Sequence, residues 1–382
     1  MPQLCRKPMP SLRFFYPALL VCVFSSNFLW GSTIRLASLG GENDLLRDSS
    51  NIYLYPALAH ELPHFGVALF DNWAGAVYPL GQRHALGLFF NRPTPQQNRL
   101  NAYISKNGSA IFNSLQVHPL ADVLYGLKLG KNLQLGLLAR LAYAKRERDS
   151  TDAAASSADL RLGLRLGNLN ATIGFLRRNL KDMDHSTEGV ASLPDKDTNG
   201  YLLNLRLRMK LTPQLHFYPS AGFEKSSYSL GANRQDEKTQ HLGFSFNVRP
   251  ANQTLIIAGL LASYQQTEIG ATDASPALNE SILVLPTTIL AGETQVGSIL
   301  FRLGLRHENI LTSVEQFQDH RLVAKDDFTT AFKTNLGVGL EFGSLLLDGL
   351  LERDFLRDGP HLIGGSRHGG GIFSKISITF HF

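Results

Sequence analysis

The chain has 382 residues, 43% of them hydrophobic, and its 37 lysines and arginines against 32 acidic residues give a net charge of +5. A mean hydropathy of −0.07 and the lack of any apolar run of about twenty residues beyond the N-terminus exclude a bundle of membrane-spanning helices. Three basic residues, Arg6, Lys7 and Arg13, lie in the first 32 positions, which hold no acid. Without them the net charge is +2, too small to indicate a nucleic-acid partner.

Residues 1–32 are predicted to be a secretory signal peptide. The apolar stretch Phe14–Leu29 follows the basic start and is too short to span a bilayer comfortably. Gly31 and Ser32 are small residues suited to cleavage. A lipid anchor on Cys22 and an uncleaved N-terminal anchor are the alternatives.

The only cysteines, Cys5 and Cys22, both fall in this N-terminal segment. The mature protein is therefore expected to have no disulfide and no cysteine-based metal site. We expect no cofactor.

Residues 33–63 are rich in turn-forming residues. They contain Leu39-Gly40-Gly41, then Asp48-Ser49-Ser50-Asn51, then Tyr55-Pro56-Ala57. We therefore predict a compact N-terminal plug or hatch here and not a set of strands.

The run His60-Glu61-Leu62-Pro63-His64 matches the HExxH pattern of zinc proteases. That chemistry needs both histidines on one face of an unbroken helix, with Glu61 as the base. Pro63 removes a helix hydrogen bond between the two histidines, so we interpret the match as a coincidence in a loop. We expect no metal site and no enzyme activity.

Residues 64–382 form a series of segments in which apolar and polar residues alternate. In Tyr201–Leu211 every odd position is apolar, while the even positions include Arg206 and Arg208. Leu133–Arg146, Asp159–Leu166 and Ile299–Arg306 follow the same period of two, which is the period of a strand. The pattern predicts an all-β fold, a transmembrane antiparallel β-barrel behind the N-terminal plug. We expect 14–16 strands, and His64–Leu80 is either one strand or a tight hairpin.

The connections between these segments alternate in length. Short turns are expected near residues 130–132, 167–168, 212–214, 249–252 and 342–344. Longer polar stretches at 147–157, 179–198, 229–238, 268–280, 309–327 and 355–370 are expected to be loops. Short turns at one rim and long loops at the other are typical of bacterial outer-membrane barrels.

Several arginines are expected to point into the lumen, because their neighbours in sequence are apolar and face lipid. The candidates for binding a ligand there are Arg140, Arg161, Arg165, Arg206, Arg208, Arg302 and Arg306. One interpretation is a lumen biased toward anions such as carboxylates. The other is a set of arginine–carboxylate ladders that brace the wall, which the cost of unpaired charge in a confined lumen favours.

The last twelve residues, Gly371–Phe382, have one apolar face. Ile376, Ile378, Phe380 and Phe382 fall on that face and are predicted to form the assembly signal of the barrel. We expect this segment to close the barrel against the earliest strand, near His64–Phe70.

Three places in the sequence resemble the FadL-type outer-membrane barrels, a group that includes the PorV-like proteins of secretion systems. They are Gly40-Gly41 through Tyr55-Pro56-Ala57, then Tyr78-Pro79-Leu80-Gly81 with Ala85-Leu86-Gly87-Leu88, and the ending at Phe373–Phe382. The ending resembles the signal that the barrel assembly machinery recognises. Tyr55 stands where the group usually has asparagine. The resemblance implies a barrel with a hatch in its lumen that passes small apolar molecules, with lateral release as one route.

The first functional hypothesis is therefore an outer-membrane channel or transporter for small hydrophobic or amphipathic solutes. The second is a barrel that acts as scaffold or shuttle in a protein secretion system and binds secretion-system proteins. The third is an outer-membrane lipid hydrolase. The expected partners are outer-membrane lipid, the barrel assembly machinery and a small hydrophobic solute.

Overall fold

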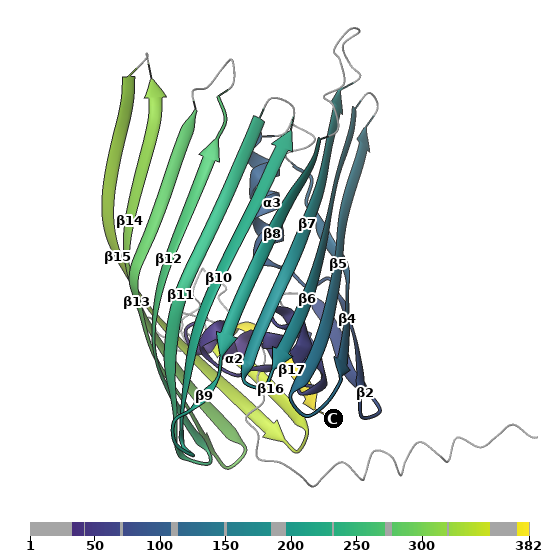
Figure 1. Ribbon diagram of the computed structural model, residues 1–382, viewed down its shortest axis with the longest axis vertical. Coiled ribbons are helices and arrows are strands. Elements are labelled where there is room, and N and C mark those ends of the chain that lie inside the picture. Colours follow the sequence, from purple (N-terminus) through teal and green to yellow (C-terminus); the bar gives the residue numbers. More distant parts are fainter. Residues whose placement is uncertain are drawn as a thin grey trace, which may run out of the picture.

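The computed structural model describes residues 33–41, 43–68, 72–107, 114–148, 151–184, 196–230, 233–271, 277–318, 321–351 and 373–381. These residues form one closed antiparallel barrel with short helices inside it (Figure 1). The sheet contains 17 strand segments, and two of them, β8 and β9, are parts of one wall strand separated by Arg208. The described wall therefore has 16 strands, which confirms the prediction of an all-β barrel of 14–16 strands.

The wall segments are β1 His64–Ala68, β2 Trp73–Leu80, β3 His84–Phe90, β4 His118–Lys128, β5 Leu133–Arg148, β6 Thr151–Leu166, β7 Leu169–Asp184, β8 Lys196–Leu207, β9 Met209–Lys210, β10 Leu215–Leu230, β11 Asn233–Ala251, β12 Thr254–Ile269, β13 Leu278–Val296, β14 Ile299–Gln318, β15 Arg321–Phe342, β16 Leu345–Leu351 and β17 Phe373–His381. The helical elements are α2 Thr33–Ser38, η3 Asn43–Leu45, η4 Ser49–Tyr53, η5 Pro56–His60 and α3 Pro95–Asn107. No helix in these ranges is long and apolar enough to cross a membrane.

The last strand closes the barrel onto the first, as predicted. β1 pairs with β17 through Phe65 opposite Phe380 and Val67 opposite Ile378. β1 also pairs with β2, so His64–Leu80 is a hairpin and not one strand. Closure gives every strand of the described wall a neighbour on each side, although β15 pairs with β16 only over Gly337–Phe342.

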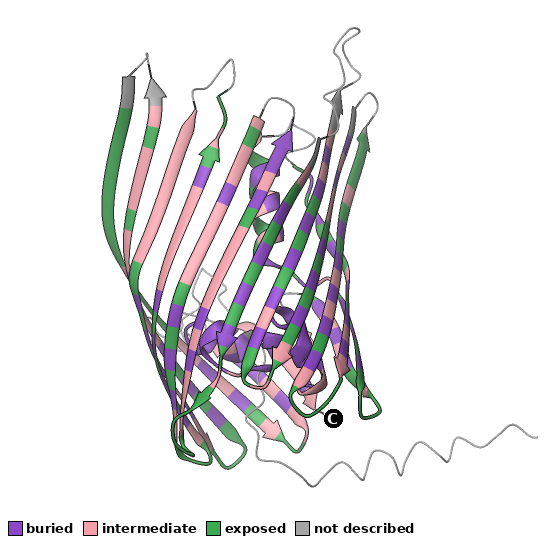
Figure 2. Cartoon of the chain, in the orientation of Figure 1, coloured by how far each residue is buried: buried purple, intermediate pink, exposed green. Residues whose placement is uncertain are grey.

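The two faces of the wall differ as the alternation predicts. On β6, Leu160, Leu162 and Leu164 are exposed on the outside, whereas Asp159 and Arg161 are buried on the inside. The same alternation follows the lower parts of several other strands, such as β11 and β12, whereas residues 323–330 of β15 are all exposed (Figure 2). A closed strand wall with an apolar outer face satisfies its backbone hydrogen bonds within a bilayer, and this is how outer-membrane proteins cross. The protein is thus a barrel of the bacterial outer membrane.

One rim carries tight turns. Gly81, Gly167, Gly297 and Gly343 occupy these turns with positive φ angles of 74°, 57°, 62° and 62°, a conformation that side chains disfavour. The short turns expected at 167–168 and 342–344 are among them. This rim is the lower one in Figure 1.

The expectation of long loops at the other rim is wrong at 147–157, 229–238 and 309–327. β5 and β6, β10 and β11, and β14 and β15 continue as paired strands through these polar stretches. An antiparallel ladder satisfies its backbone groups wherever it extends, so polar side chains only require that this part of the wall lie beyond the lipid. Residues 185–195, 272–276 and 352–372, which hold most of the other predicted loops, lie outside the described residues.

Two bodies fill part of the lumen. The segment 33–62, drawn in purple in Figure 1, lies within the lower half of the barrel. Helix α3, which the sequence analysis did not anticipate, packs against the inner face of the wall. Its Leu100, Tyr103 and Ile104 join a buried cluster with Leu180 and Tyr228. The predicted signal peptide, residues 1–32, lies outside the described residues.

Candidate functional site: the plug and the lumen wall

We call residues 33–62 the plug. Its α2 contacts β14 to β17, its η3 contacts β10 and β11, and its η5 contacts β2 to β6. The plug therefore touches the wall on widely separated sides and crosses the lumen. Its own fold is fixed by polar contacts: Asp48 and Asn51 cap η4 reciprocally, and the Tyr55 hydroxyl donates to Asp44 Oδ1 at 2.7 Å.

Burial, and then the neighbouring Asp44 carboxylate, raise the pKa of Tyr55. The phenol consequently stays protonated and keeps donating to Asp44. The Arg206 guanidinium lies 4.7 Å from the Tyr55 ring centre, which adds a cation–π contact from the wall.

One side of the plug is docked by close backbone approach and apolar contact. A Cβ atom at Gly136 would lie 2.1 Å from the Pro56 carbonyl carbon, and one at Gly163 would lie 2.8 Å from the Ala57 nitrogen. Only glycine at these inward positions lets η5 sit against β5 and β6. Around it, plug residues such as Leu58 and Leu62 share a buried cluster with wall residues such as Phe89.

The opposite side of the plug also lies against inward-facing glycines, here on β14 and β15. A Cβ atom at Gly304 would lie 2.6 Å from the Ser38 carbonyl oxygen, and one at Gly337 would lie 2.6 Å from the Ser38 Cβ. Arg306 donates to the Gly40 carbonyl oxygen at 3.1 Å. Two pairs of inward-facing glycines, one on β5 and β6 and one on β14 and β15, therefore let the two sides of the plug lie against the wall.

A buried ion network joins α2 to the wall. Arg35 donates to Glu293 at 2.7 and 2.8 Å and to Asp48 at 2.9 Å, while Arg302 donates to Glu293 at 2.5 Å and to Asp348 at 2.6 Å. Burial by itself lowers the pKa of Arg35, but the Glu293 and Asp48 carboxylates outweigh it and raise that pKa. The side chains are essentially inaccessible to water, so breaking one contact leaves a charge without solvent.

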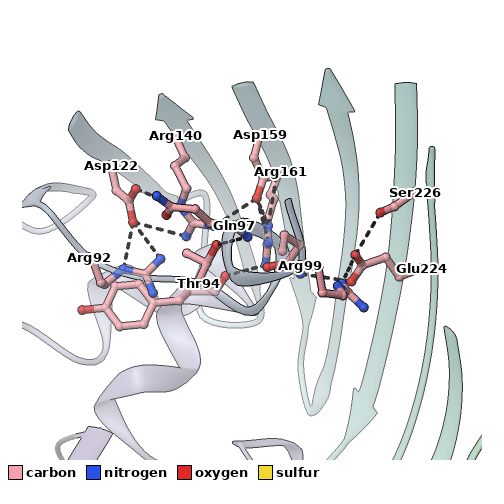
Figure 3. Close-up of polar contacts among 12 residues, drawn as sticks. Arg92, Thr94, Gln97, Arg99, Asp122, Arg140, Asp159, Arg161, Glu224 and Ser226 are labelled. Carbon is pink, nitrogen blue, oxygen red and sulfur yellow. Dashed lines mark hydrogen bonds and ion pairs between the residues drawn. The ribbon is translucent and has the colours of Figure 1, made fainter. Parts of the chain in front are cut away.

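A second ladder crosses the wall next to the η5 side (Figure 3). Arg92 donates to Asp122 at 2.8 Å, and Arg140 bridges Asp122 at 2.8 Å to Asp159 at 3.1 Å. Arg161 completes the ladder with a 2.7 Å bond to Asp159 and donates to the Tyr53 carbonyl oxygen at 3.1 Å. This ladder links β4, β5 and β6 to the plug.

Helix α3 is held against β10 by an ion pair and hydrogen bonds. Figure 3 shows Arg99 of α3 reaching Glu224 of β10, with Ser226 donating to the same carboxylate. Gln96 donates to Glu224 at 3.0 Å. The helix is therefore fixed to the inside of the barrel.

Five of the seven predicted arginines pair with carboxylates in the structure. Arg140 and Arg161 belong to the ladder, and Arg302 belongs to the buried ion network. Arg306 pairs with Glu308 and also contacts the plug. Arg165 pairs with Glu61 of the plug.

The last two are neighbours on the same face. Arg206 donates to the Leu46 carbonyl and to Asn51 Oδ1, both at 3.0 Å. Arg208 instead contacts His216 at 3.3 Å. Most of these contacts are of the bracing kind, and a ligand role for these arginines stays a prediction.

A cavity of about 210 Å³ lies between the plug and the lower wall. Its basic lining residues are Arg47 of the plug, Arg208, His216 and Arg249, and Leu46, Leu62 and Leu255 are among its apolar lining residues. In the described part of the chain, neither Arg208 nor Arg249 has a carboxylate within 4.0 Å.

The terminal strand carries the predicted assembly signal. By register, Phe380 and Ile378 share the outward face with Phe65, which is 40% exposed, and Ile376 continues that face; Ser377 and Thr379 are buried on the inner face. Phe382 lies outside the described residues. The role of these residues in assembly stays a prediction.

The HExxH run does not form a helix. His60 ends the 3-10 turn η5, and His64 begins strand β1 after Pro63. No group of three potential ligands suited to a metal ion occurs among the residues that the structure describes.

The sequence analysis missed the plug partners Arg35, Asp48 and Glu293 and the ladder residue Asp122. One signal was available: isolated glycines at inward strand positions, such as Gly136 and Gly304, indicate a close backbone approach. The identity of the approaching segment was not available, because Arg35 and Glu293 are 258 residues apart in sequence.

Comparison with known proteins adds little beyond the barrel itself. No protein-family model and no curated protein sequence matches the chain. Solved structures with some similarity are the siderophore receptor PirA from Acinetobacter baumannii, at 7% identity over 75% of this chain and 61% of that one with a TM-score of 0.34. OmpT, an outer membrane protein of Vibrio cholerae, matches at 10% identity over 84% of this chain and 94% of that one with a TM-score of 0.30.

A mutant of the ferric enterobactin receptor from Pseudomonas aeruginosa matches at 8% identity over 75% of this chain and 66% of that one, with a TM-score of 0.34. The chain thus spans less than two thirds of the length of these receptors. At these scores the assignment to the outer-membrane barrels rests on the strand order, the closure and the two faces of this chain.

Proposed function

We propose that this protein is an outer-membrane transporter in which the plug controls the passage of small hydrophobic or amphipathic solutes. The observation that carries the proposal is the docking of the plug across the lumen by two sites of different chemistry. The η5 side is held mainly by apolar packing, with a partly exposed ion pair between Glu61 and Arg165, and the α2 side is held by a fully buried ion network. The proposed function is selection and passage, without catalysis.

The two docking sites suggest which side moves. Apolar packing around η5 needs no water, whereas the charges of Arg35, Glu293 and Arg302 regain hydration when they separate. We therefore assign the moving half to α2 and the fixed half to η5. The resemblance of residues 40–57 and of the terminal strand to FadL-type barrels supports a hatch of this kind.

A reversible lock tests the proposal. Ser38→Cys with Gly337→Cys, in a chain without Cys5 and Cys22, places one thiol on α2 and one on β15. The Cβ positions are 2.6 Å apart, so the added side chain at residue 337 must push α2 away by about an ångström to reach disulfide spacing, and the flux of Gly337→Cys alone measures the effect of that displacement. In proteoliposomes, oxidation should stop solute flux and a reductant should restore it.

The single-cysteine variants are the controls and should respond to neither reagent. Equal flux of the oxidised and reduced double variant, with the disulfide verified by mass spectrometry, would rule out a gate at α2.

A further inference from the structure

We infer that the cavity between the plug and the lower wall is a binding site for a dianionic phosphate group carried on a small organic body. The lining brings together Arg47 from the plug, Arg208 from the break between β8 and β9, His216 from β10 and Arg249 from β11. This inference concerns binding and stands independently of whether the plug moves.

The charge of the cavity is the first argument. Arg208 and Arg249 have no carboxylate within 4.0 Å in the described ranges, and Arg47 shares Glu61 with Arg165. Asp48, the acid on the cavity lining, is held by Arg35 at 2.9 Å. At least two positive charges are therefore left without a protein counter-charge, which matches a dianion better than a monocarboxylate.

The crowding of these cations supports the same conclusion. Burial, and then the charges of Arg208, Arg206 and Arg249, lower the pKa of Arg47. Elsewhere in this lumen, partly buried arginines such as Arg306 are paired with a carboxylate. Guanidinium groups suit phosphate because their planar fork donates two parallel hydrogen bonds to its oxygens.

The size and the apolar side of the cavity indicate more than a free ion. Its volume of about 210 Å³ far exceeds the roughly 10–15 Å³ that one water molecule needs on the same measure. Leu46, Leu62 and Leu255 line it together with the cations. A phosphomonoester with a small apolar substituent contacts both the basic and the apolar lining residues, whereas inorganic phosphate contacts only the basic ones.

Equilibrium binding to the full chain in zwitterionic nanodiscs tests the inference. The probes are phenyl phosphate, inorganic phosphate and benzoate, and calorimetry measures their dissociation constants. Phenyl phosphate should bind more tightly than either of the other two. Arg208→Gln and Arg249→Gln should each weaken it by about tenfold or more, because each removes charge-assisted hydrogen bonds to the phosphate.

Arg234→Gln is the matched control, because Arg234 lies at the opposite rim with a side chain 67% exposed, and it should leave the constant unchanged. Arg208→Lys, which keeps the charge and loses the fork, should fall between the wild type and Arg208→Gln. Heat-modifiable migration in gels verifies that each variant is a folded barrel.

Two further arms distinguish the source of the phosphate. Nanodiscs that contain phosphatidic acid should abolish phenyl phosphate binding if a lipid head group is the natural occupant, and leave it unchanged if the occupant is a soluble ester. Either result supports a phosphate site. Benzoate binding as tight as phenyl phosphate, or binding unaffected by both Arg208→Gln and Arg249→Gln, would overturn the inference.

Discussion

Replacing Arg35 by methionine should release the α2 half of the plug. Arg35 donates charge-assisted hydrogen bonds to both carboxylate oxygens of Glu293 and to Asp48, and the side chains of these residues are buried. Removal of one partner from a buried ion pair costs about 3–5 kcal/mol, chiefly because the remaining charges lose their compensation. In this variant Glu293 still pairs with Arg302, so the expected cost of the substitution is about 4 kcal/mol, the middle of that range.

If that energy acts only on docking, about 4 kcal/mol corresponds to roughly a thousandfold shift toward the undocked plug at about 1.4 kcal/mol per factor of ten. Single-channel recording in planar bilayers measures the shift as open probability, which should rise by up to that factor in Arg35→Met. Arg234→Met is the control, because an exposed ion pair contributes at most about 1 kcal/mol.

A double variant separates the network from a general loss of stability. Arg35→Met with Glu293→Gln removes both charges of the pair, and the coupling between the two substitutions should amount to at least about 1 kcal/mol. If Arg35→Met recorded the same open probability as the wild type, with a normally heat-modifiable barrel, the reasoning about the α2 dock would be refuted.

Three other changes test separate parts of the structure. Gly163→Val should expel η5, because even a Cβ there lies 2.8 Å from the Ala57 nitrogen; added trypsin should then cleave the plug, whereas Gly130→Val, with nothing within 4 Å, should stay protected. Leu162→Arg on the outer face should lower the free energy of unfolding by roughly 2–4 kcal/mol in denaturant titrations, and a loss below about 1 kcal/mol would contradict the assignment of this face to lipid. Deletion of Phe382 should reduce the heat-modifiable barrel in the outer membrane more than deletion of any residue of 355–370, and equal yields would argue against the terminal signal.

The sequence by itself determined that the protein is a transmembrane antiparallel β-barrel. The alternation in Asp159–Leu166 and Tyr201–Leu211 is a local property, since a strand of period two shows one face to lipid and the other to the lumen. The closing pair of β1 and β17 also followed from the sequence, because a barrel in a bilayer leaves no strand unpaired. The extent of the strands did not follow, since polar ladders such as β14 and β15 are stable beyond the lipid.

Only the tertiary structure decided what the lumen residues do. Arg206 and Arg208 occupy the same face two residues apart, and no local pattern separates them. The plug places the Leu46 carbonyl and Asn51 against Arg206 and leaves Arg208 beside a cavity. The physical reason is distance along the chain: the plug groups that contact Arg206 come from segments more than 150 residues away, and their positions depend on the docking of the plug.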